Sequence, residues 1–150
     1  MNHELQRLAN ELSLDDDRQE NLRVAFGLAC VERVRHLLED PRAVAALAVG
    51  RAFVEGNCDR TALEAAAAEA AVTATSHPGS NSIDGSGHAA VSATYAVSKA
   101  LAGRALEAAE YAAYATVYAY SGHAISDPAA FADEYGWQVE ALRSLSRSTA

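Results

Sequence analysis

Alanine occupies every second or third position of this chain between residues 61 and 124, most densely in residues 65 to 71 and 112 to 119. Alanine has the highest helix propensity of the amino acids and the smallest side chain that bears a β-carbon. Segments of this composition predict helices whose axes approach one another closely. Because the chain also lacks an alternating strand pattern of β-branched and aromatic residues, the sequence predicts an all-α fold.

Chain length and turn-forming residues predict one compact domain. A chain of 150 residues fits a single core. Residues 1 to 17 are its N-terminal segment, with a short amphipathic helix over residues 2 to 12, and residues 76 to 87 form a flexible glycine and serine loop. Further helices are expected over residues 17 to 39, 41 to 55, 60 to 75, 88 to 101, 105 to 121 and 128 to 146. The sequence therefore predicts a bundle of five to seven helices.

Capping residues set several of these boundaries. The acidic run at residues 15 to 17, and Asp40 before Pro41, are typical of helix starts. Aspartate accepts hydrogen bonds from the free amides of a first turn, and proline fits the first helical position. Gly56 is expected to end the helix before it, and Gly103 to bend or end the helix that precedes residue 105.

Two segments, residues 85 to 98 and 111 to 126, contain no charged residue. A helix without charge on any face is usually enclosed by other helices, so these two are expected at the centre, with Tyr114 and Val117 covered. Alanine buries little apolar area per residue, and a second copy of the chain would complete the core. A twofold homodimer with contacts at Val117 and Tyr118 is the corresponding expectation.

The charge balance disfavours two classes of partner. The chain has 12 Lys and Arg against 20 Asp and Glu, and Lys99 is its one lysine. Binding to nucleic acid or to an anionic membrane depends on clustered Lys and Arg, so neither is expected. The N-terminus has no signal-like segment, and no apolar stretch approaches the roughly 20 residues that span a bilayer, which predicts a cytoplasmic protein. The acidic surplus serves either solubility or a basic protein partner.

Residues with metal or nucleophile chemistry are scattered. Cys30 and Cys58 lack metal-site spacing and are interpreted as free thiols, Cys30 in the core. The histidines form no pair at helical spacing, so no metal is expected. The loop of residues 76 to 87 lacks the Gly-Lys-Ser ending of a phosphate-binding loop, and no Gly-x-Ser-x-Gly elbow is present. The sequence therefore predicts neither a cofactor nor catalysis.

Tyrosines and acidic runs supply the candidate sites. Tyr111, Tyr114 and Tyr118 fall on one helix face, which Tyr95 is placed to meet, and the whole set is interpreted either as packing or as the lining of a ligand pocket. The residues of that pocket would be Tyr95, Tyr114, Tyr118, His88 and His123. The acidic residues Asp15, Asp16, Asp17, Asp133 and Glu134 are first helix-start signatures, and second a patch for a basic partner.

One stretch carries a family resemblance. Cys30-Val31-Glu32-Arg33-Val34, the restart at Asp40-Pro41-Arg42 and the alanine-dense helices that follow resemble the opening of the Imm-5-like immunity proteins, and the likeness extends over about residues 20 to 121. The resemblance implies an antitoxin-like bacterial protein that binds and blocks a secreted toxin without catalysis. Two interpretations remain: an acidic inhibitor of a basic toxin, or a small-molecule-binding or enzymatic bundle with a tyrosine-lined pocket.

Overall fold

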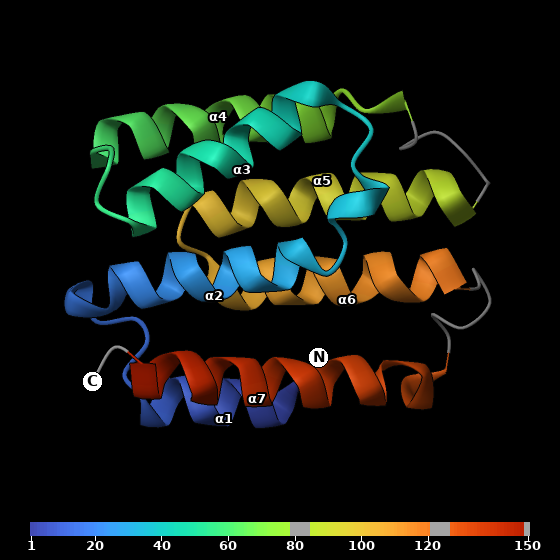
Figure 1. Ribbon diagram of the computed structural model, residues 1–150. Coiled ribbons are helices and arrows are strands. Elements are labelled where there is room, and N and C mark those ends of the chain that lie inside the picture. The colour runs from blue at the N-terminus through green and yellow to red at the C-terminus, as the bar shows by residue number, and fades with distance from the viewer. Residues whose placement is uncertain (79–84, 121–126, 149–150) are drawn as a thin grey trace.

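The computed structural model describes residues 1–78, 85–120 and 127–148, and within these ranges every regular element is a helix (Figure 1). The all-α prediction is confirmed. The elements are α1 (His3–Glu11), η1 (Asp17–Gln19), α2 (Glu20–Glu32), η2 (Arg35–Leu37), α3 (Pro41–Val54), α4 (Arg60–Thr75), α5 (Gly85–Leu101), α6 (Ala105–Tyr120), η5 (Pro128–Phe131) and α7 (Ala132–Ser148), where η marks a 3-10 helix.

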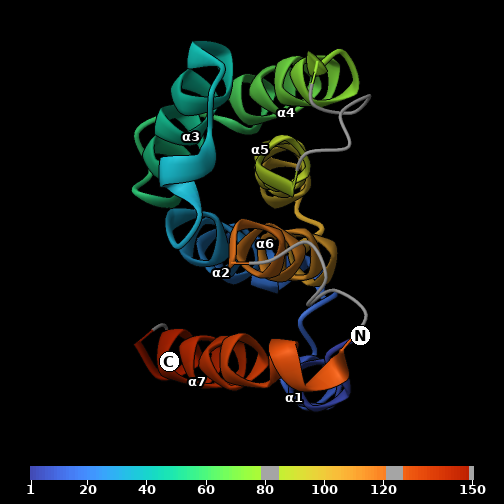
Figure 2. The ribbon, with the colours of Figure 1, turned by 90° about the vertical axis from the view of Figure 1, so that its right-hand side faces the viewer.

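The long helices are stacked in layers along one common direction. Figure 1 shows α3 and α4 at one side, α5 beneath them, α2 and α6 next, and α1 with α7 at the opposite side. Figure 2 shows α5 end-on between α4 and α6, and α5 packs against α2, α3, α4 and α6. Its alanines are fully covered, and Ala93, Ala96 and Ala100 expose none of their surface. The expected central position of the charge-free helices is thereby confirmed for α5.

Small residues at the helix contacts let the axes come together. The α-carbon of Gly27 on α2 lies so close to α5 that an added β-carbon would stand 2.9 Å from the β-carbon of Ala100. On α6, Val117 is 4% exposed and Tyr114 is 37% exposed. The α6 helix is therefore covered on its alanine and valine side, whereas one edge of it reaches the surface.

The aspartates at the helix starts act as caps. Asp16, Asp40 and Asp59 each accept a hydrogen bond from a backbone amide of the turn that follows.

Three helix ends share one backbone geometry. Ser13, Gly56 and Gly103 have positive φ angles of 52°, 80° and 76°, and the amides around them bond back to the preceding turn. This is the Schellman arrangement. Figure 1 shows all three of these ends on the same side of the bundle.

The expected helix over residues 17 to 39 is wrong in its second half, because α2 ends at Glu32. The amides of Arg33 and Val34 bond to carbonyls only three residues back, which tightens the chain and places Val34 in the core at 1% exposure. Leu38 is then extended. A residue close before a proline avoids the helical conformation, and Pro41 restarts the chain as α3.

Two other boundaries differ from the expectation. The helix expected from residue 88 starts at Gly85, so the last residues of the predicted loop are helical, while residues 79 to 84 of that loop lie outside the described ranges. The last helix, expected from Pro128, begins as the 3-10 turn η5 before α7.

Candidate functional site

The acidic run before α2 is partly neutralised by the chain itself. Asp16 accepts two hydrogen bonds from the Arg18 guanidinium, at 3.0 Å each, and one from the Arg18 backbone amide at 2.9 Å. These bonds favour the ionised carboxyl and lower the pKa of Asp16 to about 2. Asp15 and Asp17 are exposed and form no ion pair among the described residues. Only these two carry charge that a partner would meet uncompensated.

The second acidic pair, Asp133 and Glu134, divides in the same way. Asp133 is exposed, whereas Glu134 is 5% exposed and accepts two bonds from the Arg33 guanidinium, at 2.8 and 2.9 Å. Glu134 therefore joins α7 to α2 and presents no carboxylate at the surface. Figure 1 shows that the start of α7 and the α1–α2 connection lie at opposite ends of the bundle, so the predicted acidic residues do not form one patch.

A different acidic surface gathers at the end of the bundle that holds the α1–α2 and α3–α4 connections. The two connections are tied together by the Glu20–Arg60 ion pair at 2.7 Å and by a hydrogen bond of 3.2 Å from the Asn21 amide to the Val54 carbonyl. Six carboxylates at this end form no ion pair among the described residues: Glu11, Asp15, Asp17, Glu55, Asp59 and Glu64. We call these six residues the acidic end.

Sequence reasoning identified only part of the acidic end. Glu55 and Asp59 lie about 40 residues from Asp15 along the chain, and only the packing of α3 against α2, and of α4 against α3, brings the two connections together. The sequence did show that Glu55 lies at a predicted helix end and Asp59 at a predicted helix start. That signal indicates a surface turn and does not indicate which other turn is its neighbour.

The tyrosines form a ladder along the seam between the antiparallel helices α5 and α6. Tyr95 stacks on Tyr111 with ring centroids 5.2 Å apart, and His88 meets Tyr118 at 5.4 Å. The predicted contact of Tyr95 with this face is therefore confirmed. The ladder ends in the ion pair of Lys99 with Glu107, at 3.7 Å.

Aromatic contacts continue from this ladder to the start of α7. Tyr114 packs edge-on against Phe131 at 5.3 Å, and Phe131 in turn meets Tyr135 at 5.4 Å. These rings contact one another, which agrees with the interpretation of the tyrosines as packing. His123, the remaining residue of the predicted pocket, lies outside the described residues.

Val117, predicted as a dimer contact if α6 were only half covered, is 4% exposed within the single chain, and the homodimer itself stays a prediction. Val117 lies in a small core cluster with Ala113 and Phe131, because η5 folds over this part of α6. Tyr118 is half-buried beside His88. The part of α6 around Val117 is therefore covered by the chain's own C-terminal segment, whereas Tyr120 at the end of α6 is 89% exposed.

The residues that carry the family resemblance have structural roles. Cys30 exposes none of its surface, and burial raises the pKa of its thiol far above the ordinary value. Glu32 forms ion pairs with Arg35 and Arg51, and Arg33 lies over the Trp137 ring at 4.2 Å while it binds Glu134. The Cys-x-Glu-Arg element therefore fastens α2 to α3 and α7.

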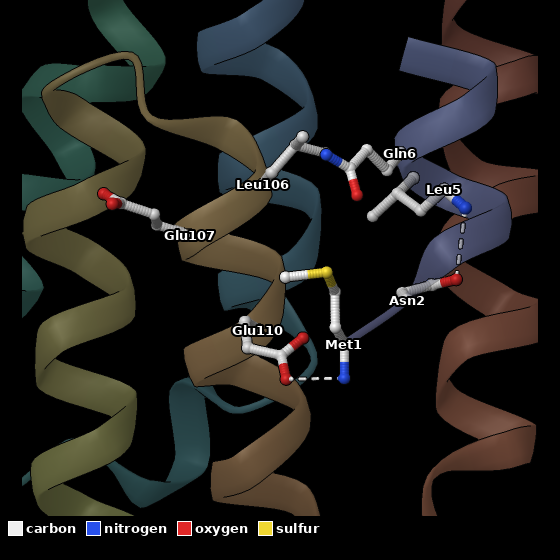
Figure 3. Close-up of a pocket in the computed structure, with 7 residues that line it drawn as sticks. All are labelled: Met1, Asn2, Leu5, Gln6, Leu106, Glu107 and Glu110. Carbon is white, nitrogen blue, oxygen red and sulfur yellow. Dashed lines mark hydrogen bonds and ion pairs between the residues drawn. The ribbon is translucent and has the colours of Figure 1, made fainter. Parts of the chain in front are cut away.

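A cavity that sequence reasoning missed lies between α1 and α6. It has a volume of about 320 Å³ and is lined by Met1, Asn2, Leu5, Gln6, Leu106, Glu107 and Glu110 (Figure 3). Glu110 accepts the Tyr135 hydroxyl at both oxygens, at 3.0 and 3.2 Å. Burial and the Glu110 charge raise the pKa of Tyr135. No spacing in the sequence connects the first turn of α1 with the middle of α6.

The described ranges 1–78, 85–120 and 127–148 contain no group of three or more His, Cys, Asp or Glu side chains placed to share a metal ion. None of the described helices combines the length and the apolar character needed to cross a membrane. The chain matches no protein-family model, and no curated protein or solved structure matches it.

Proposed function

We propose that this protein is a non-catalytic binding protein of the bacterial cytoplasm, and that it neutralises a basic toxin by covering it with the acidic end. The observation that carries the proposal is the set of six carboxylates, on or beside two adjoining connections, that form no ion pair within the part of the chain that the structure describes. Opposite charge on a partner would steer the encounter and raise the association rate.

The distribution of charge supports a surface role for these carboxylates. Other acidic groups are neutralised locally by arginines, as Arg33 and Arg42 do for Glu134 and Asp40 and as Arg18 does for Asp16 within the α1–α2 connection itself. At the acidic end, Glu11, Asp15 and Glu55 are exposed and have no such partner among the described residues. Unpaired exposed carboxylates that repel one another add little to folding, so a contribution to recognition is the better physical account of their grouping.

The resemblance to immunity proteins supports the toxin as partner. Its residues build the frame of the bundle, since Cys30 lies in the core and Arg33 fixes α7. A common frame with a variable charged surface is what a family of inhibitors of different toxins would need.

The protein encoded beside this chain's gene is the partner to test. Its toxicity on expression in bacteria should be suppressed when this chain is co-expressed, and the two purified proteins should associate. The variant Asp15→Asn, Asp17→Asn, Asp59→Asn removes charge from the acidic end, and asparagine caps a helix about as well as aspartate. We expect association at low salt to be about tenfold slower, with a weaker dependence on salt.

The matched control is Glu4→Gln, Asp127→Asn, Asp133→Asn, which removes the same charge from residues outside the acidic end. It should leave the association rate within about twofold of the wild type. A neighbouring gene without a toxic product would contradict the immunity assignment. Equal effects of the two variants would contradict the acidic end as the binding surface.

A further inference from the structure

The cavity between α1 and α6 combines the carboxylates of Glu107 and Glu110 with largely apolar walls. Leu5 and Leu106 line it from α1 and α6, and Figure 3 shows the Gln6 side chain between these two leucines and the Met1 side chain between them and Glu110. Its volume of about 320 Å³ is at the lower end of the range for small-molecule sites. Pockets of that kind combine mostly apolar walls with a few placed polar groups.

The two carboxylates at the cavity, those of Glu107 and Glu110, differ in their ion-pair partners. Glu107 is already paired with Lys99 and Arg104, at 3.7 and 3.3 Å, and Figure 3 shows it pointing toward α5. Glu110 has no Lys or Arg partner among the described residues. Its one ion-pair partner among the described residues is the N-terminal ammonium of Met1 at 3.5 Å, so Glu110 is the carboxylate at this cavity for which a bound ammonium ion would compete.

Glu110 is held in place from behind. The Tyr135 hydroxyl lies within hydrogen-bond distance of both carboxylate oxygens, and Tyr135 is fixed by its packing on Phe131. The nearest nitrogen on the cavity side is the amino nitrogen of Met1, 3.5 Å from Oε1. That distance is longer than a good hydrogen bond between an ammonium group and a carboxylate, so a better-placed ammonium can approach more closely.

We propose that this cavity binds a small organic ammonium ion with an apolar tail, the ammonium on Glu110 and the tail against Leu5 and Leu106. A carboxylate in partly apolar surroundings attracts a cation more strongly than one in open water. The same charge repels anions. The apolar walls gain from burial of a hydrocarbon chain, which selects amphipathic amines over simple cations such as ammonium itself.

The proposal is tested on the full chain with hexylammonium as the probe, observed through the NMR signals of the Leu5 and Leu106 methyl groups. Saturable shifts are expected with hexylammonium. Binding should be at least about tenfold weaker with 1-hexanol, which lacks the charge, and absent with hexanoate. Glu110→Gln should weaken hexylammonium binding about tenfold, because glutamine keeps an acceptor for Tyr135 and loses the charge.

The control variant is Glu69→Gln, an equal charge change on α4 outside both the acidic end and the cavity, and its affinity should stay within about twofold of wild type. Absence of saturable shifts, equal binding of 1-hexanol or hexanoate, or equal affinities of the two variants would overturn the proposal. If Glu110→Gln fails to fold, the comparison of the three probes on the unmodified protein still decides it. This test is independent of the toxin-binding experiment, because the acidic end and this cavity share no residue.

Discussion

Arg33, directly after α2, and Glu134 on α7 form a two-bond ion pair across the bundle, between residues far apart in the sequence, with Trp137 beneath the guanidinium at 4.2 Å. Glu134 is 5% exposed. Because a carboxylate of such low exposure would be costly without its partner, this pair fixes how the last helix sits on the rest of the protein.

Removal of either partner should therefore destabilise the protein markedly. Arg33→Ala and Glu134→Ala are each expected to lower the free energy of unfolding by about 2 to 3 kcal/mol, with a coupling energy in the double mutant of about 1 to 3 kcal/mol. The exposed pair Arg143 with Glu140 is the control, and its coupling should be about 0.5 kcal/mol. Urea unfolding of the four variants of each cycle measures both values. Equal coupling energies in the two cycles would contradict the structural role of the Arg33–Glu134 pair.

Gly27 on α2 and Gly136 on α7 should respond oppositely to substitution by alanine. A β-carbon at Gly27 would clash with Ala100 at 2.9 Å, whereas at Gly136 it would meet no atom within 4 Å. We expect Gly27→Ala to destabilise by about 1 to 3 kcal/mol through overpacking. Gly136→Ala should stabilise by about 0.5 to 1 kcal/mol through helix propensity. Thermal unfolding followed by circular dichroism distinguishes the two, and stabilisation by Gly27→Ala would refute the close approach of α2 and α5.

Ser13 occupies a backbone conformation that favours glycine. Ser13 has a φ of 52° after α1, and Gly103 has a φ of 76° at the equivalent position after α5. The left-handed conformation costs a non-glycine residue roughly 1 to 2 kcal/mol. Ser13→Gly should therefore raise the free energy of unfolding. The gain is limited to about 1 kcal/mol, because the greater entropy of glycine in the unfolded chain offsets part of it. Gly103→Ala should lower it by about 1 kcal/mol. Chemical denaturation measures both changes, and a loss of stability in Ser13→Gly would be the contrary result.

Asp16 should stay ionised to unusually low pH. Its pKa is lowered from the ordinary value of 3.8 to about 2, first by the side-chain bonds from Arg18. A depressed native pKa stabilises the fold above the ordinary pKa, and this contribution is lost as the pH falls from about 4 toward 2. In Arg18→Gln the Asp16 pKa should return toward 3.8, as carbon-detected NMR of the carboxyl group would show. The stability difference between this variant and wild type should vanish near pH 2, and a difference that persists there would have another cause.

The sequence alone was sufficient for the helical fold and for most helix boundaries, because these depend on local chemistry. The density of alanine, the caps at Asp40 and Asp59, and the glycines at 56 and 103 act within a few residues of their own position. The end of α2 at Glu32 was missed because it depends on a distant contact: Val34 turns into the core where other helices provide its surroundings.

The candidate sites were predictable only in part. The tyrosine contact between α5 and α6 follows from helical spacing and the antiparallel arrangement of two consecutive helices. Whether a carboxylate is paired or exposed cannot be predicted in this way. Glu134 and Asp133 are neighbours in the sequence, yet Glu134 is buried on Arg33 and Asp133 is exposed.

What the sequence by itself determined is therefore the list of helices, their caps and the overall negative charge. The tertiary structure decided which charges cancel, which connections adjoin to form the acidic end, and that Glu110 faces a cavity closed by α1. The physical reason is one of range. Helix propensity and capping act over one turn of chain, whereas ion pairing and burial depend on residues that packing alone brings within a few ångströms.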